Sequence, residues 1–396
     1  MLRVFVPYEL VVEVLSFLPV KSLKRFRCVC KSWKILISDS TFVKLHLKRS
    51  TRNKHLAIFS SIYQNSCNFR VARVPVHGLL ENPSATIADD HHFQLDNSRV
   101  SLDVVGSYNG LLCLVGCEFY STFYHGQKCG QIVFYLLNPA TRTFTNKIGA
   151  TWLTLSRSKW KFGFGYDNST DTYKILAFSL PTNDVRVLNL GHNVWRNIQN
   201  FPVVPFEDVG SYPGTSMTDG VYVSGTVNWL GIRNQSQYGY DKFSFISVER
   251  FVIISMDFST ETYCQLLPPQ SFDEVSLARS APLAALMDSL CFSYDFNGTD
   301  FIIWQMKEFR VQESWTRFLK ISYYNLLSND NPFTNCLFLF PLCLSENGGT
   351  LILACRDGEQ AILYNLSDNT VEKTRNTDTV EWFRAKNYVE SLVWTG

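Results

Sequence analysis

The chain has 396 residues, of which 46% are hydrophobic and 18% charged, and its formal net charge is +2 at pH 7. The hydrophobic share excludes an intrinsically disordered chain, and no apolar run reaches the roughly 18 residues that a transmembrane helix requires. Aromatic residues make up 14% of the chain, an excess that favours β-rich structure.

Charge is unevenly distributed along the chain. Residues 1–54 hold 12 Lys or Arg and 3 acidic residues, a formal charge of +9, whereas the remainder holds 25 basic and 32 acidic residues, a charge of −7. This difference indicates two modules, of which the first suits an acidic protein partner. We expect no nucleic-acid partner, because the basic residues form no groove-reading motif.

The 11 cysteines show no regular spacing, and most lie among apolar neighbours, as Cys113 and Cys291 do. This pattern favours reduced, buried thiols in a cytosolic or nuclear protein over disulfides. The first residues lack the uninterrupted apolar stretch of a secretory signal, so we do not expect secretion.

Residues 7–18 show the first helical pattern. Pro7 suits the first turn of a helix, where its missing N–H costs nothing, and Leu10, Val14 and Leu18 follow at steps of four residues. Pro19 should end this helix, because its ring clashes with a continuing turn.

Residues 22–37 show a second helical pattern, for which Ser22 is a candidate N-cap. Three or four short helices of this size bury little surface, so we expect a partner to cover their exposed apolar face. The apolar seam of this second pattern, at steps of 3, 4, 3 and 4, consists of Leu23, Phe26, Cys30, Trp33 and Ile37.

Residues 48–99 connect the helical region to the rest of the chain. The stretches 58–63 and 69–74 have the apolar character of a strand pair, which belongs either to a first blade or to a bridge, and 83–97 is polar and loop-like.

From about residue 100 an octet recurs: an apolar residue, Asn or Asp, four mostly turn-forming residues, often Thr, and an apolar or aromatic residue. Because Asn and Asp start turns and Thr and aromatics re-enter strands, each octet predicts a hairpin. A second repeated element is a glycine turn that feeds an apolar strand. The octets begin at Leu137, Tyr166, Leu188, Met256, Tyr294 and Tyr364, and the glycine turns lie at Gly110, Gly225 and Gly349.

Repeated hairpins predict repeated four-stranded sheets, as in a β-propeller. The 297 residues of 100–396 suit about six blades of roughly 50 residues each; a two-sheet sandwich with long loops is the alternative. The chain is therefore expected to be α+β, with a helical module at 1–47, a linker and start of the β domain at 48–99, and an all-β, propeller-like domain at 100–396.

Motifs of catalysis are absent from the sequence. There is no G-x-G-x-x-G after a strand, no Walker-type G-x-x-x-x-G-K loop and no G-x-S-x-G elbow. The seven histidines are scattered away from any C-x-x-C pair, and Cys28 and Cys30 should point to different sides of a helix. We therefore expect no catalytic residue, no metal ion and no cofactor.

The segment from Val6 to Trp33 resembles an F-box, whose pattern includes Leu-Pro-x-Lys-Ser-Leu-x-Arg-Phe-Arg-x-Val-Cys-Lys-x-Trp. The match covers nearly thirty positions, with Val6 for the usual Leu and Val14 for the usual Ile as departures. The body resembles the plant F-box-associated domain, including its S-locus F-box and F-box-kelch-like relatives. The residues that carry this second resemblance are 106–114 (GSYNGLLCL), 137–141 (LNPAT), 162–167 (FGFGYD) and 225–230 (GTVNWL).

The resemblance implies the substrate-recognition subunit of an SKP–cullin–F-box ubiquitin ligase. Its F-box would bind an acidic SKP-family adaptor, and through it cullin and RING subunits, and its β domain would recruit an unknown protein substrate for ubiquitination and degradation. No catalytic residue is needed, because the mechanism is positioning. The candidate adaptor-binding residues are Pro7, Leu10, Leu15, Leu18, Pro19, Val20, Leu23, Phe26, Val29, Cys30 and Trp33.

Two alternatives remain open at the level of sequence. The first is a propeller enzyme that uses the F-box as a localising arm, and the second is a propeller-type binding scaffold with no ubiquitin role. Some of the candidate residues must also pack the helices together, and for Phe26 and Trp33 core packing and adaptor contact are equally expected.

Overall fold

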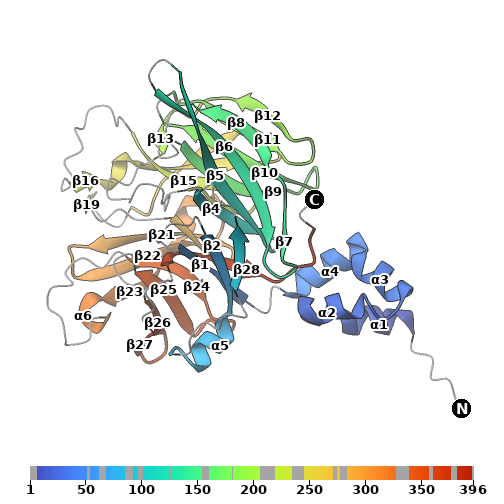
Figure 1. The fold of residues 1–396 in the computed structure, drawn as a ribbon. Coiled ribbons are helices and arrows are strands. Elements are labelled where there is room, and N and C mark those ends of the chain that lie inside the picture. Colours follow the sequence, from blue (N-terminus) through green and yellow to red (C-terminus); the bar gives the residue numbers. More distant parts are fainter. Residues whose placement is uncertain are drawn as a thin grey trace, which may run out of the picture.

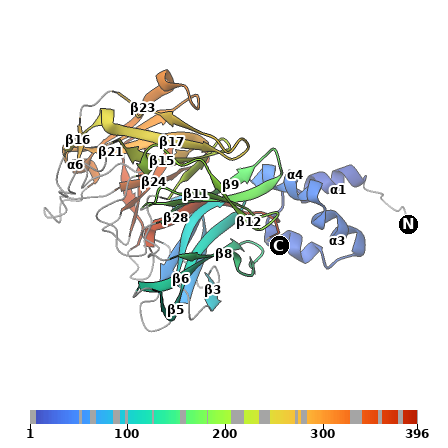
Figure 2. The same ribbon diagram turned by 90° about the horizontal axis from the view of Figure 1, so that it is seen from above.

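The computed structural model shows a small helical module beside a larger ring of β-sheets (Figures 1 and 2). The structure describes residues 7–50, 54–61, 68–84, 92–96, 101–124, 127–153, 160–180, 182–205, 219–233, 245–270, 274–276, 283–326, 339–355, 360–375 and 381–394.

The helical module contains four helices within the described residues. Pro7 is the N-cap of the first and Pro19 the N-cap of the second, so both prolines start helices. The expectation that the first helix continues to Pro19 was wrong, because this helix ends at Leu15 and a turn follows. The expectation that Ser22 caps the second helix was also wrong, because that helix already begins after Pro19. The helices are α1 (Tyr8–Leu15), α2 (Val20–Phe26), α3 (Lys31–Ser38) and α4 (Ser40–Ser50).

The seam predicted for one continuous pattern is divided between α2 and α3. The backbone N–H groups of Cys28 and Val29 donate to the carbonyls three residues back, and Cys30 is extended. Periodicity did not reveal this break because the short turn keeps the helical step. Cys28 and Cys30 therefore lie exposed in a turn, not on a helix as expected.

Apolar side chains from all four helices form the core of the module. Phe26 of α2 meets Trp33 of α3 edge to face, with ring centroids 5.3 Å apart. The fully buried members of this core are Leu15, Leu23, Leu36, Ile37 and Phe42.

The β domain is a six-bladed propeller, as predicted: the described residues form six sheets of four or five strands and one separate strand pair. In the first three blades the strands are β28 (Glu381–Val389), β1 (Lys54–Ser61), β2 (Asn68–Pro75) and β3 (His92–Asp96); then β4 (Ser101–Tyr108), β5 (Leu111–Tyr124), β6 (Gln127–Asn138), β7 (Thr143–Phe144) and β8 (Ile148–Leu153); then β9 (Trp160–Asp167), β10 (Thr172–Ser179), β11 (Val185–Asn189) and β12 (Val194–Ile198).

The remaining blades follow in chain order, with two short helices at the rim. They contain β13 (Val204–Pro205), β14 (Val221–Val223), β15 (Thr226–Ile232), β17 (Phe251–Asp257) and β18 (Tyr263–Leu266); then β20 (Leu283–Leu286), β21 (Ser289–Phe296), β22 (Asp300–Met306) and β23 (Trp315–Ser322); then β24 (Leu339–Leu344), β25 (Thr350–Cys355), β26 (Ala361–Asn365) and β27 (Val371–Lys373). The separate strand pair is β16 (Phe245–Ser247) with β19 (Glu274–Ser276). The two short α-helices are α5 (Val76–Glu81) and α6 (Tyr323–Leu326), and two 3₁₀ turns lie at Val248–Arg250 and Gln312–Ser314.

The last strand of the chain closes the ring. β28 pairs antiparallel with β1, with Lys54 opposite Val389 and Ala57 opposite Lys386. The stretches 58–63 and 69–74, which the sequence left open as blade or bridge, overlap β1 and β2 of a blade whose inner strand comes from the C-terminal end. The expectation of a loop at 83–97 was wrong in part, because β3 lies within it and pairs with β2. The pairing of β28 with β1 joins the first and last parts of the described propeller within one blade.

Neighbouring blades are held together by buried apolar layers. Each of the six adjacent pairs shares one cluster of buried side chains, and Phe134 of β6 and Phe162 of β9, for example, meet with ring centroids 5.2 Å apart. These layers explain the long apolar strands of the sequence, because a strand between two other blades is buried on both faces.

The octets form the predicted hairpins. In five of the six octets the Asn or Asp side chain accepts the backbone N–H two residues on, at 2.8–3.0 Å. The residue four positions after it adopts a left-handed conformation, with φ between 52° and 60°, which reverses the chain. These left-handed residues are Arg142, Asp171, Asn193, Glu261 and Asn369.

The glycine turns also feed the predicted strands, and Gly110 shows why one of them needs glycine. Its φ is +77°, and a Cβ there would meet Ser391 Oγ and lie 2.7 Å from the carbonyl oxygen of Val389. Gly225 has a similar φ of +81°, but nothing lies within 4 Å of a Cβ there. Gly110 therefore permits both the turn and the close approach of the C-terminal segment.

We expect Gly110→Ala to lower the free energy of unfolding by about 2–3 kcal/mol, because it adds overpacking to the backbone strain. Gly225→Ala is the matched control and should lower it by only about 1 kcal/mol, from strain alone. Urea unfolding of both variants measures the difference, and equal losses would show that the contact with the C-terminal segment contributes nothing.

Candidate partner-binding surfaces

Helix α1 is apolar on two sides. Val11 and Leu15 face the core of the module. Leu10 and Val14 of α1 and Phe17 of the turn that follows it, at steps of four and three residues, face outward and are 54%, 62% and 51% exposed. We call these three residues the α1 stripe. A stripe of large apolar side chains in water is costly and marks a surface that another molecule covers.

The rest of the module adds to this surface. Of the twelve large hydrophobic side chains that are exposed in the described residues, six lie between Tyr8 and Ile35. Beyond the α1 stripe these are Tyr8, Val29 and Ile35, each more than half exposed. The concentration of half the exposed large hydrophobics in one small module distinguishes it from the propeller.

The structure sorts the predicted adaptor-binding residues by exposure. Three are buried: Leu15 and Leu23 within the module, and Val20 against the propeller. Adaptor contacts through Leu15 and Leu23 would require the module to open, and a contact through Val20 would require it to separate from the propeller. The partly buried residues are Leu18, Phe26 and Trp33, and the exposed ones are Pro7, Leu10, Pro19, Val29 and Cys30.

Sequence reasoning missed four exposed residues of this surface and grouped others wrongly. It placed Leu10, Val14 and Leu18 on one stripe, whereas Leu18 turns toward the core and the outward stripe continues to Phe17 instead. A helical step shows that residues share a side but not which side faces water. The missed residues are Tyr8, Val14, Phe17 and Ile35.

A different side of the module is fixed to the propeller. Val20 packs with Tyr388, its backbone N–H donates to Glu390 Oε2 at 3.3 Å, and Lys24 Nζ donates to the carbonyl oxygen of Thr141 at 2.6 Å. In both ribbon views α4 lies toward the propeller, whereas α1 and α3 lie farther out (Figures 1 and 2). The propeller therefore leaves the α1 stripe uncovered.

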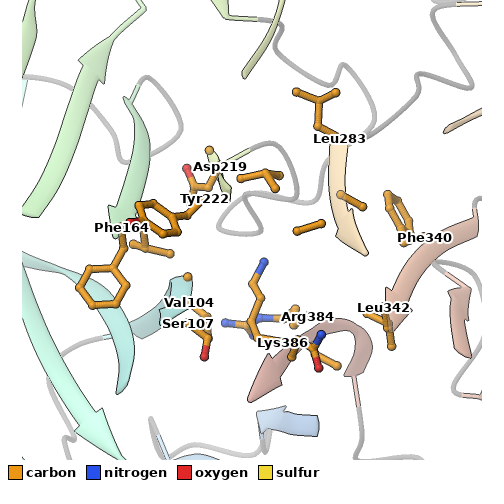
Figure 3. A pocket seen from close by; sticks show the side chains of 18 of the residues that line it. Val104, Ser107, Phe164, Asp219, Tyr222, Leu283, Phe340, Leu342, Arg384 and Lys386 are labelled. Atoms are coloured by element: carbon orange, nitrogen blue, oxygen red, sulfur yellow. The ribbon is translucent and has the colours of Figure 1, made fainter. Parts of the chain in front are cut away.

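The centre of the propeller contains a second candidate site. A cavity of about 190 Å³ is lined by the innermost strand of every blade (Figure 3). Arg384 donates to Asp103 Oδ1 at 3.0 Å and to Glu381 Oε2 at 2.8 Å. Lys386 points into the cavity (Figure 3), and burial lowers its pKa, although Asp219 and Asp103 partly oppose this shift.

The cavity can hold a small polar group, and two of its carboxylates have fixed partners. Asp103 is paired with Arg384, and Asp219 Oδ1 accepts the backbone N–H of Phe162 at 2.8 Å. Sequence reasoning did not find this site, because its residues come from six separated strands with no shared motif. We interpret these pairs as stabilising the inner strands of the ring.

Two further properties concern metals and membranes. In the ranges that the structure describes, no three His, Cys, Asp or Glu side chains gather as metal ligands would. Among the same residues, no helix is long and apolar enough to cross a membrane.

Comparison with known proteins gives matches for both parts of the chain. Residues 6–45 match the family of the F-box domain, and residues 58–394 match that of the F-box associated beta propeller domain. These ranges coincide with the helical module and the propeller.

Similar proteins are named for an F-box followed by repeats. An F-box/kelch-repeat protein of Arabidopsis thaliana is 26% identical over 98% of this chain and 95% of its own length. An F-box/LRR-repeat/kelch-repeat protein of the same plant is 24% identical over 99% of this chain and 98% of its own. Among solved structures, TolB from Acinetobacter baumannii aligns with 85% of this chain and 66% of that chain, at 11% identity and a TM-score of 0.48.

Proposed function

This chain belongs to the F-box proteins that carry an F-box associated β-propeller domain, and from that membership we propose that it is the substrate-recognition subunit of an SKP–cullin–F-box ubiquitin ligase. The F-box would bind an SKP-family adaptor and, through it, the cullin and RING subunits. The propeller would hold a protein substrate.

The observation that carries the proposal is the uncovered α1 stripe. The module is fastened to the propeller through α2, so its other apolar surface is free for a second protein. We place the adaptor contact on the exposed members of the predicted set together with the missed residues. This proposed contact surface consists of Pro7, Tyr8, Leu10, Val14, Phe17, Pro19, Val29, Cys30 and Ile35.

The charge of the module supports an acidic adaptor. Residues 1–54 carry +9, and opposite charges at the rim of an interface steer association and fix its register. The apolar centre then supplies most of the binding free energy, because a few well-packed large side chains dominate an interface.

In this proposal the chain acts by positioning and carries no catalytic residue. Holding a substrate near the charged conjugating enzyme makes the attack of its lysine effectively intramolecular. The attachment of the module to the propeller serves this purpose, since it sets where the substrate lies relative to the adaptor. Loops at one face of the propeller are the expected substrate contacts.

The test is reconstitution with a purified SKP-family adaptor, followed by a cullin–RING complex. We expect the full chain to co-elute with the adaptor in size-exclusion chromatography and to recruit cullin only when the adaptor is present. A chain that binds the adaptor but never cullin would instead be a scaffold without a ubiquitin role. A folded chain that binds no adaptor would refute the proposal.

The substrate can be sought by affinity capture with the proteasome inhibited, comparing the full chain with one lacking residues 1–45. Proteins retained by both chains would be candidate substrates, and those lost with the deletion would belong to the ligase. The proposal would be contradicted if the deletion removed some proteins and none of them were a ligase subunit.

A further inference from the structure

A basic cleft separates the helical module from the propeller. Its volume is about 580 Å³, within the range of small-molecule sites. Lys21, Lys24 and Arg25 of α2 line one wall, and Arg73 of β2 and Arg142 of the β6–β7 turn line the other. We call these five residues the junction cations.

The charge of the cleft is poorly balanced. Glu390 is the one carboxylate in its described lining, and it is already bonded to Arg73 at 2.7 Å and to the N–H of Val20 at 3.3 Å. Across the part of the chain that the structure describes, no acidic side chain pairs with Lys21, Lys24 or Arg25. Clustered cations repel one another, and a single carboxylate offsets only part of this repulsion.

The folding of the chain does not account for this cluster. Lys21 and Arg25 are exposed and form no described ion pair, so nothing in the packing of α2 requires a positive charge at either position. Lys24 does bond across the junction, but to a neutral carbonyl, so its charge stays uncompensated.

We propose that the cleft binds a compact small molecule that carries several phosphate groups and bridges the two modules. Arginine presents a planar fork that suits phosphate oxygens, and lysine adds point charges around it. Because the junction cations lie on two walls, one phosphate would reach only some of them, whereas a polyphosphate reaches both. The size of the cleft favours a compact ligand over an extended nucleic acid.

Such a ligand would lock the helical module against the propeller. It would touch α2 on one side and two blades on the other, and so would add to the few direct contacts across the junction. That this locking regulates ubiquitin transfer rests on the proposed function, whereas the binding itself does not.

The test is calorimetric titration of the full chain with tripolyphosphate at fixed ionic strength, without any adaptor. We expect saturable binding at one site and a rise in Tm with ligand, since a ligand that binds only the folded state stabilises it. Lys21→Glu combined with Arg25→Glu should weaken binding at least about tenfold, because each lost charge-assisted contact is strong. Lys31→Glu with Lys34→Glu, the same charge change on exposed residues of α3, should stay within about twofold.

Three outcomes would overturn the proposal. The first is absence of saturable binding to the wild-type chain, and the second is an equal loss in the α3 control, which would indicate diffuse attraction. The third is tighter binding of a peptide with a single phosphoserine than of tripolyphosphate. If the Lys21→Glu, Arg25→Glu variant loses adaptor binding and the wild-type chain does not bind tripolyphosphate, the cleft binds an acidic protein and the proposal is wrong.

Discussion

Replacing two residues of the α1 stripe, Leu10→Asp with Val14→Asp, is expected to weaken binding of the SKP-family adaptor at least ~100-fold. Each substitution removes an apolar contact and would place a charge inside a dry interface, at a cost of about 2 kcal/mol or more. Both residues are more than half exposed, so the free chain should keep its Tm. Calorimetric titration and thermal unfolding measure the two effects.

The matched control places the same charges on exposed apolar residues of the propeller, Val194→Asp with Tyr324→Asp. These residues are also more than half exposed but lie far from α1 in the sequence and in another module. The control should bind the adaptor as the wild type does. If the stripe variant folds and still binds normally, the adaptor contacts another surface.

The structure also decides which substitutions are unsuitable for this test. From sequence alone, Leu18→Asp with Leu23→Asp is a natural choice, because both residues belong to the F-box pattern. Leu23 is fully buried between the helices and Leu18 packs against the same core. A charge there would unfold the module, and loss of binding would then say nothing about contact.

The second large effect concerns an ion pair buried in the propeller, and we expect Asp167→Ala to lower the free energy of unfolding by about 3 kcal/mol. The side chain of Asp167 is fully buried, lies 2.9 Å from Lys174 Nζ and accepts the hydroxyl of Ser259 from the next blade at 2.9 Å. Its removal leaves a buried lysine with fewer partners, which is costly.

Asp257→Ala is the matched control, because Asp257 occupies the same octet position in the next blade. Its ion pair with Arg310 is partly exposed and long, at 3.4 Å. The control should lose the two turn hydrogen bonds from the N–H groups of Ser259 and Thr260 and a weak ion pair, together about 1 kcal/mol. Urea unfolding of both variants measures the difference, and equal losses would mean that burial of the Lys174 pair is unimportant.

The same carboxyl makes acid stability depend on pH. Burial opposes its ionisation, but hydrogen bonds from Ser169, Lys174 and Thr170 together outweigh this and hold the pKa of Asp167 well below its usual range. A lowered folded pKa stabilises the protein above the unfolded value of about 3.9, and that contribution is lost as pH falls further. Unfolding measured between about pH 5 and 2 should therefore vary less steeply with pH in the Asp167→Ala variant.

The propeller was predictable because its turns repeat a local chemistry. An Asn or Asp that bonds the backbone two residues on is visible in the sequence, and five of the six octets form this turn. The closing strand was not predictable, because the pairing of β1 with β28 depends on residues more than 300 positions apart. No local pattern records that pairing.

The docking surface was only partly predictable for a similar reason. The F-box pattern identified the apolar residues of the module but not their environment. Val20 is buried because the propeller covers it, and Leu10 is exposed because the propeller lies on another side. The central cavity and the junction cations likewise bring together distant segments.

Hydrogen–deuterium exchange of the chain with and without a purified SKP-family adaptor tests the central claim most directly. If the uncovered apolar surface is the docking site, the adaptor should slow exchange in α1, in the turn at 27–30 and in α3, while the propeller strands stay unchanged. Slowed exchange confined to the propeller, or no change in the helical module in a complex shown to form, would contradict the account.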